Sequence, residues 1–287
     1  MMIRNPVEWI ADELMHVGHA MRSITHPVHA SGDAIGVGPP MIRRIGVSDL
    51  KDVVAKGFSD LGANRADIVF LCFFYPVIGL ILARVASGGE MLPLLFPLAS
   101  GFALVGPLAG VGLYEISRLR ERGVEARWRA AFGVVHSPSF GGIVLLGLVL
   151  TGVFIVWLLT AHVIYLATFG AQAPESIVGF VRAVLTTPAG WMMTILGVGA
   201  GFIFALLVLT ISVVSFPMLL DRDVGVELAV RTSIRAVVAN PGPMALWGLI
   251  VASGLVIGSI PLFLGLVIVL PVLGHSTWHL YRKIVVN

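Results

Sequence analysis

Two histidines near the C-terminal end of the chain are the first residues whose type and spacing could do chemistry. His275 and His279 are four residues apart, so a helix places both imidazoles on one face, a spacing that can hold a metal or a haem iron. Aromatic and basic side chains surround them, namely Trp278, Tyr281, Arg282 and Lys283. Because this mixture is typical of a span end at the membrane interface, we favour an interfacial anchor, with a cofactor site or a partner contact as alternatives.

A second set of possible ligands lies near the N-terminus. Asp12, His16 and His19 fall on one face of a predicted helix, and carboxylate and imidazole groups both bind transition metals. No further ligand on a rigid element is visible nearby, so we favour a solvated helix face. No cofactor is therefore predicted, and haem or a transition metal remains the lesser alternative at either set of histidines.

His162 is the histidine expected in the middle of a span, within the apolar run "LLTAHVIYL". An ionisable residue at membrane depth is a functional hypothesis by default, but a neutral imidazole bonded to a backbone carbonyl explains it equally well. An oxidase catalytic subunit would need several such histidines at facing positions. The sequence also has no phosphate-binding loop, no Gly-x-Ser-x-Gly and no His-Glu-x-x-His motif, so no catalytic residues are predicted.

The elements that position these residues must lie in a membrane. Of the 287 residues, 57% are hydrophobic and only 12% are charged, whereas a soluble domain averages about 25% charged residues. The fold class predicted is all-α, a polytopic membrane protein with about six transmembrane helices and interfacial amphipathic helices in its cytoplasmic loops. The net charge of +3 is small and scattered, so no nucleic-acid partner is expected.

The chain divides into two predicted parts. Residues 1–41 form a cytoplasmic N-terminal helix and a flexible linker, and residues 42–287 form a six-span membrane domain. Apolar runs near the ~20 residues that a bilayer span requires are expected at about 68–86, 91–114, 141–168, 190–216, 243–259 and 261–281. Only the short stretch "GSIP" separates the last two runs, so a broken or re-entrant pair is an open alternative.

Basic residues predict the orientation. Seventeen of the 19 Lys and Arg residues lie before the first span, in the loops 115–140 and 220–242, or after the last span. Since loops rich in Lys and Arg stay on the cytoplasmic side, both termini are expected in the cytoplasm, which an even number of spans requires.

Amphipathic segments recur beside these spans. Residues 46–61 predict a helix whose apolar face carries Leu50, Val53 and Gly57, with Asp60 on the opposite, polar face. The loops at 123–138 and 225–241 each combine an amphipathic helix with a break at proline before the next span, and residues 176–191 repeat this unit on the other side of the membrane.

In the copy at 225–241, the apolar stripe is expected to consist of Val226, Val230, Ile234 and Val237. Glu227 and Arg231 are four residues apart and can pair on the other face. Residues expected among the anionic headgroups in these two loops are Arg127, Trp128, Arg129, Arg231 and Arg235.

Three stretches carry a resemblance to a known family: residues 42–61 ("IRRIGVSDLKDVVAKGFSDL"), residues 219–241, and residues 271–285 ("PVLGHSTWHLYRKIV"). They resemble bacterial predicted integral membrane proteins that are defined only as a domain of unknown function. The resemblance covers roughly residues 42–287 and implies a multi-pass protein of the bacterial inner (cytoplasmic) membrane. It implies no established activity.

Three functions remain open at this point. The first is a structural or accessory component of a larger membrane complex, for example a respiratory one. The others are a transporter or permease for a small molecule or lipid, and a protein that handles haem or metal. The expected partners are anionic lipid headgroups and either another membrane protein or a second copy of the chain.

Overall fold

The computed structural model describes residues 40–63, 77, 80, 84, 93–124, 131, 133–135, 137, 139–172, 174 and 176–286. The N-terminal candidates Asp12, His16 and His19 lie outside these residues, as do Arg127, Trp128 and Arg129. The metal-binding and interface predictions for these six residues therefore stay predictions.

The described chain is almost entirely helical, which confirms the predicted all-α class. Its helices are α2 (Val47–Ala63), α4 (Leu95–Ala109), α5 (Val111–Glu121), α6 (Phe140–Phe169), α7 (Ile177–Thr186), α8 (Pro188–Ser212), α9 (Ser215–Asp221), α10 (Val226–Ala239), α11 (Pro241–Ser259) and α12 (Leu266–Ile284). A short antiparallel pair of strands, β1 (Met41–Ile42) and β2 (Val285–Val286), joins the segment before α2 to the end of α12.

Within the described residues, four helical segments are long and apolar enough to cross a membrane: Phe96–Glu121, Phe140–Phe169, Pro188–Asp221 and Pro241–Ser259. They correspond to the second, third, fourth and fifth predicted spans. The first predicted span lies almost wholly outside the described residues. The count of six spans therefore stays a prediction.

The last predicted span, 261–281, differs from the other four. The chain turns at residues 260–265, where Leu262 and Phe263 have φ angles of 52° and 64°, and α12 then runs back beside α11. Side chains at the tip of this hairpin are exposed and apolar, with Ile260 at 76% and Leu262 at 69%. The far half of α12 is instead buried in the protein, so α11 and α12 make a hairpin with one apolar and one polar end.

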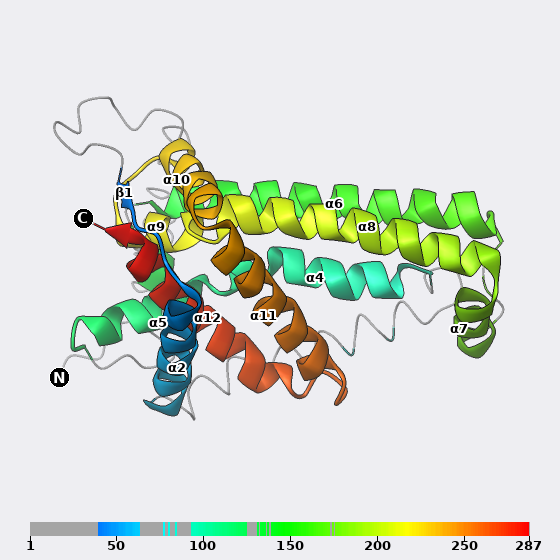
Figure 1. The fold of residues 1–287 in the computed structure, drawn as a ribbon, viewed down its shortest axis with the longest axis horizontal. Helices are drawn as coiled ribbons and strands as arrows, with labels where there is room; N and C mark the ends of the chain where they lie inside the picture. Colours follow the sequence, from blue (N-terminus) through cyan, green and yellow to red (C-terminus); the bar gives the residue numbers. More distant parts are fainter. Residues whose placement is uncertain are drawn as a thin grey trace, which may run out of the picture.

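One half of the molecule is an apolar arm made of α4, α6, α7 and α8. The long helices α6 and α8 run side by side, and α7 lies across their far end (Figure 1). The side chains of Ser176 and Thr187 cap α7 and α8 by accepting hydrogen bonds from Gly179 N and Gly190 N. Large apolar side chains such as Leu159, Ile195 and Phe202 are 60–68% exposed on the arm, as expected where lipid is the solvent.

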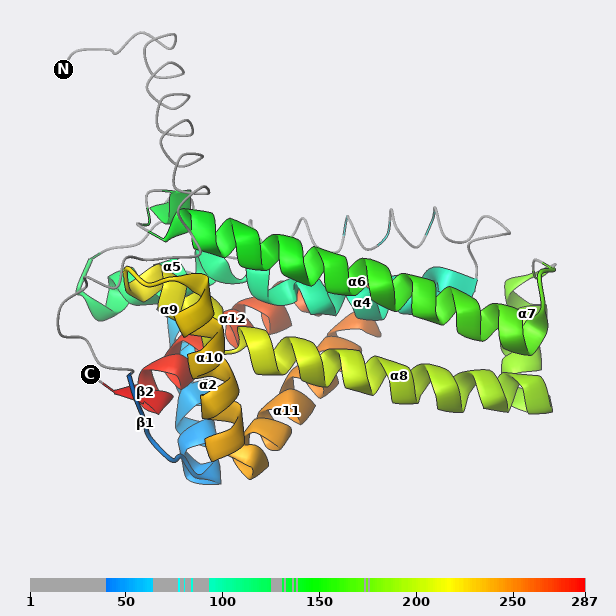
Figure 2. The ribbon, with the colours of Figure 1, turned by 90° about the horizontal axis from the view of Figure 1, so that it is seen from above.

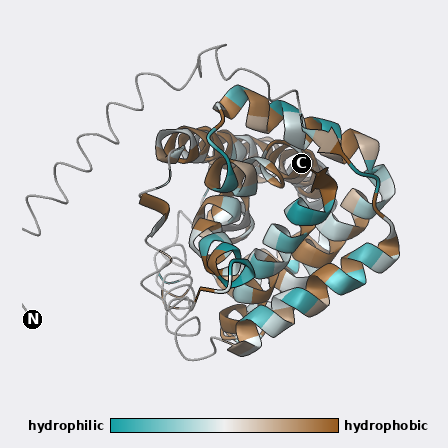
Figure 3. Cartoon of the chain, turned by 90° about the vertical axis from the view of Figure 1, so that its left-hand side faces the viewer, coloured by the Kyte–Doolittle hydropathy of each residue, from teal (hydrophilic) through white to brown (hydrophobic). Residues whose placement is uncertain are grey.

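The other half is a polar head made of α2, α5, α9, α10 and α12. In both views of the ribbon, α2 and α10 run across the direction of α6 and α8 (Figures 1 and 2). Hydrophilic residues are visible on the helices of this end when it is viewed directly (Figure 3). The core of the head includes α9, in which all residues from Ser215 to Leu220 are buried.

Helix α10 packs on the protein through small side chains beside the predicted apolar stripe, of which Val226, Val230 and Val237 are partly buried against the core. Its buried residues are Ala229, Thr232, Ser233 and Ala236, whereas Ile234 of the predicted apolar stripe is 39% exposed. Small side chains let α10 approach the core closely, and Ser233 Oγ accepts a hydrogen bond from Val214 N at the break between α8 and α9. The predicted pair between Glu227 and Arg231 is confirmed, at 2.6 Å.

The break after α10 is also used to hold the head together. Asn240 is buried, its Oδ1 accepts a hydrogen bond from Ile45 N at 2.8 Å, and its Nδ2 donates to the carbonyls of Ala236 and Arg43. The Asn240 side chain therefore provides hydrogen-bond partners both for the last turn of α10 and for the segment that follows β1. Pro241 then starts α11.

Candidate functional site in the polar head

A buried carboxylate, Asp60 on α2, is the centre of a polar cluster between α2, α5 and α12. Its Oδ1 accepts a hydrogen bond from Arg120 Nη1 at 2.7 Å. Its Oδ2 accepts from Ser117 Oγ at 2.6 Å and is 2.9 Å from His279 Nε2. Burial alone would raise the pKa of Asp60, but the hydrogen bonds from His279 and Ser117 outweigh it and hold the pKa below its usual value.

His275 contributes the second part of the cluster and is completely buried. Its Nδ1 lies 2.7 Å from Ser117 Oγ. Because the single proton of Ser117 is donated to Asp60, the imidazole must donate its own Nδ1 proton to the Ser117 oxygen. A relay of donors thus runs from His275 through Ser117 to Asp60, and His275 Nε2 has no hydrogen-bond partner among the described residues.

Close contact between α2 and α12 makes this cluster possible. A Cβ atom on Gly57 would collide with Ser276 Oγ and the Val272 carbonyl, so only glycine fits at this crossing. Gly57 and Asp60 are one helical turn apart and face α12 together, which brings the carboxylate within reach of both histidines.

The predicted spacing of His275 and His279 is confirmed to place both rings toward one partner. The partner in the structure is the Asp60 carboxylate, at 2.9 Å from His279 Nε2 and 4.0 Å from His275 Nδ1. Among the described residues, no group of three or more His, Cys, Asp and Glu side chains has the arrangement of a metal site. The haem and metal alternatives stay predictions.

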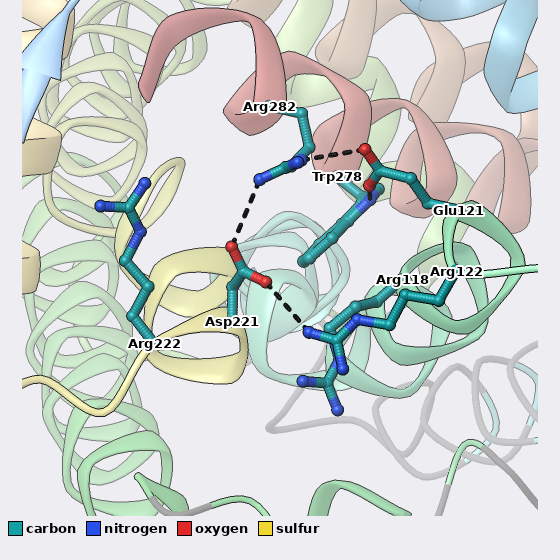
Figure 4. Close-up of a pocket in the computed structure, with 7 residues that line it drawn as sticks. All are labelled: Arg118, Glu121, Arg122, Asp221, Arg222, Trp278 and Arg282. Atoms are coloured by element: carbon teal, nitrogen blue, oxygen red, sulfur yellow. Dashed lines mark hydrogen bonds and ion pairs between the residues drawn. The ribbon is translucent and has the colours of Figure 1, made fainter. Parts of the chain in front are cut away.

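Beside the histidines, α12 also borders a polar pocket of about 540 Å³, which we call the arginine pocket (Figure 4). It is lined by Arg118, Glu121, Arg122, Asp221, Arg222, Trp278 and Arg282. Asp221 lies between Arg282 Nη1, at 3.5 Å, and Arg122 Nη2, at 3.7 Å. Glu121 accepts a hydrogen bond from Arg282 Nε and one from Trp278 Nε1, both at 3.1 Å.

Two aromatic residues of the expected interface belt require a correction. Trp278 is 1% exposed and Tyr281 is completely buried, so neither side chain reaches the lipid interface in this chain. Their polar atoms explain the difference, because the Trp278 indole donates to Glu121 and the Tyr281 hydroxyl donates to Asp221 at 3.0 Å. Both groups find their partners inside the head instead of among headgroups.

Lys283 ends α12 with a double ion pair to α2. Its Nζ is 2.8 Å from Asp49 Oδ1 and 2.8 Å from Asp52 Oδ2. Hydrogen bonds to Asp49 and Asp52 raise the pKa of Lys283, and the backbone of Gly46 together with Lys283 lowers the pKa of Asp49. This residue of the predicted belt therefore fastens two helices of the head.

The remaining candidates lie on the surface. Arg231 and Arg235 on α10 are exposed, and their predicted contact with headgroups stays a prediction. His162 is exposed on the outer face of α6. The transporter hypothesis requires a polar cavity inside the bundle near His162. The exposed position of His162 does not support such a cavity.

Sequence reasoning missed Asp60, Ser117 and Asp221. Asp60 was expected on the polar face of its helix, but the structure buries Leu50, Val53, Gly57 and Asp60 together. The spacing of these four residues, alternately three and four apart, could have revealed the stripe. Ser117 and Asp221 carry no comparable local signal, since their partners lie far away along the chain.

Comparison with known proteins gives one match. No curated protein and no solved structure matches the chain. The model of a family described as "Predicted integral membrane protein (DUF2189)" matches residues 95–221, from the start of α4 to the end of α9. This segment of the chain is therefore similar to a family of predicted integral membrane proteins whose function is unknown.

Proposed function

We propose that this protein is an accessory component of a larger membrane complex, such as a respiratory complex, and that its role is to bind and not to catalyse. The observation that supports the proposal is that polar side chains of the head form hydrogen bonds with one another inside the protein. Asp60, Ser117, Arg120 and His279 bond to one another across α2, α5 and α12. Buried groups satisfied in this way make the head rigid, which suits a docking element.

In this proposal, the head lies on the cytoplasmic side of a bacterial inner membrane. Among the described Lys and Arg residues within helices α2 to α12, only Arg182 lies on a helix of the arm. The far end of the arm carries Arg182 on α7, whose other exposed side chains include Val178 at 79% and Leu185 at 61%. This unequal distribution of charge supports the expected orientation.

The two helices that lie across the head offer the contact surface. Phe58 on α2 is 55% exposed and Val238 on α10 is 72% exposed, although both belong to helices packed on a polar core. In an accessory subunit, such side chains would contact neighbouring headgroups and a partner membrane protein.

The test is site-specific photocrosslinking in native membranes. A crosslinking amino acid is placed at Phe58 or Val238 in the head and, as a control in an equally exposed apolar position, at Val178 on α7. We expect one other membrane protein to crosslink from the head, and to co-purify in a fixed ratio from mild detergent. A chain that migrates alone as a monomer and gives no crosslink at either head position would contradict the proposal.

A further inference from the structure

The arginine pocket lies where the spans end. Two of the segments able to cross a membrane end at Glu121 and Asp221, and Arg122 and Arg222 follow directly after them. These four residues all line the pocket. Helices α5 and α9, which lead to these residues, belong to the polar head, so the pocket lies beyond the apolar arm, on the charged side of the molecule.

The arginines of the pocket differ in how many of their N–H donors already form hydrogen bonds within the protein. Arg118 is satisfied, because its Nε and Nη2 donate to Glu115 at 2.7 and 2.8 Å and its Nη1 lies 3.3 Å from the Leu220 carbonyl. Arg122 and Arg282 reach Asp221 only at 3.7 and 3.5 Å. These distances are ion-pair contacts longer than a normal hydrogen bond.

A guanidinium group has five N–H donors. Arg282 uses its Nε on Glu121 and Arg122 has a side-chain contact with Asp221. Each therefore retains donor capacity at the wall of the pocket, and Figure 4 shows the two side chains on either side of Asp221. Asp221 already accepts a hydrogen bond from Tyr281. The Asp221 carboxylate would therefore keep a hydrogen-bond donor if the two arginines turned to bind an anion.

The charge around the pocket favours an anion. Four arginines line it against two carboxylates, Glu121 and Asp221. Arg is the side chain best suited to planar, bidentate contacts with phosphate oxygens, and a volume of about 540 Å³ accommodates a phosphate group with part of the molecule that carries it.

We propose that the arginine pocket binds a phosphate group, held by Arg122 and Arg282 and carried either by an anionic phospholipid or by a soluble molecule. The two sources share the same recognition chemistry. The Trp278 ring forms a wall of the pocket beside the arginines, and the two arms of the experiment distinguish the two sources. This proposal does not depend on the accessory role of the protein.

The experiment uses the full chain, purified in a maltoside detergent and a phosphate-free buffer. Inorganic phosphate is titrated by calorimetry in one arm, and phosphatidic acid is added in the other, with bound lipid counted by native mass spectrometry. The variants are Arg122→Gln and Arg282→Gln. Arg231→Gln is the matched control, because it removes the same charge from an exposed arginine of the head outside the pocket.

We expect saturable binding of the probe. Its affinity should be about tenfold weaker in each pocket variant, because each variant loses one charge-assisted hydrogen bond to the phosphate. The affinity of Arg231→Gln should equal that of the wild type. Binding of phosphatidic acid identifies a lipid headgroup, and binding of inorganic phosphate alone identifies a soluble source. No saturable binding of either probe, or an equal loss in Arg231→Gln, overturns the proposal. Arg122 has a 55% exposed side chain, so Arg122→Gln keeps the test valid if Arg282→Gln fails to fold.

Discussion

The apolar arm and the polar head treat large apolar side chains in opposite ways: the arm exposes them and the head buries them. On α8, Ile195, Phe202 and Ile203 are 66–68% exposed, whereas on α9, which continues the same segment, Phe216 and Leu219 are completely buried. Lipid can solvate the arm, so its helices need few contacts with one another beyond close packing. The head carries charges that lipid cannot solvate, and it must bring partners together from distant parts of the chain. Stability that depends on specific contacts should therefore be concentrated in the head.

The largest loss is expected when the centre of the buried cluster is removed. Asp60→Ala leaves Arg120, Ser117 and His279 without their acceptor, and we expect the free energy of unfolding to fall by about 3–5 kcal/mol. Asp52→Asn, which weakens the half-exposed ion pairs of the same helix with Lys56 and Lys283, is the control, with an expected loss of about 0–1 kcal/mol. Unfolding of the purified protein in a mixed-micelle denaturant titration measures both. Equal losses in the two variants would remove the distinction between the cluster and ordinary surface ion pairs.

One substitution made in both regions tests the comparison directly. Leu219→Ala in the head opens a cavity around a completely buried side chain, and a loss of about 2–5 kcal/mol is expected. Leu159→Ala on the arm removes a side chain that is 60% exposed, and a change within about 0.5 kcal/mol is expected in detergent. The same denaturant titration applies. If Leu159→Ala proves as costly as Leu219→Ala, the outer face of α6 is covered by another protein and not by lipid.

A pair of glycines on α2 tests whether its crossing with α12 is as close as the structure indicates. Gly57→Ala forces a Cβ against the Val272 carbonyl, and we expect a loss of about 1–3 kcal/mol. A Cβ atom on residue 62 meets none of the described residues within 4 Å, so Gly62→Ala should gain about 0.5–1 kcal/mol from its greater helix propensity. Thermal unfolding followed by circular dichroism distinguishes opposite signs. A gain in both variants would show that α2 does not pack on α12 in this way.

The smallest predicted effect is a dependence on pH. Because the pKa of Asp60 is lowered in the folded chain, its stabilising effect is complete above the unfolded value of about 3.9 and is lost as the pH falls through the folded value. Wild type should therefore lose stability below about pH 4 more steeply than Asp60→Asn does. Unfolding midpoints measured in buffers across this range give the comparison. Parallel curves for the two proteins would assign the acid sensitivity to Asp49 and Asp52, whose pKa values are also lowered.

Much of the arm was predictable from the sequence. The apolar runs at 141–168 and 190–216 closely anticipate α6 and α8, and the unit at 176–191 becomes α7, the Thr187 cap and the first turn of α8. The ion pair between Glu227 and Arg231 was also predictable, since its two residues are neighbours on one helix. In each case the deciding interaction is local, with lipid or with residues a turn away.

The head was predictable only in outline. The four-residue spacing of His275 and His279 placed both rings on one face, but only the packing of α2 on α12 decided that Asp60 would meet them. The same holds for Tyr281, whose partner Asp221 is 60 positions away in the chain.

The sequence by itself determined which segments lipid can solvate, because hydropathy acts on each segment separately. The tertiary structure alone decided which charges were withdrawn from water and with which partners. A buried charge needs an acceptor or donor that only the folding of distant helices against one another can bring to it.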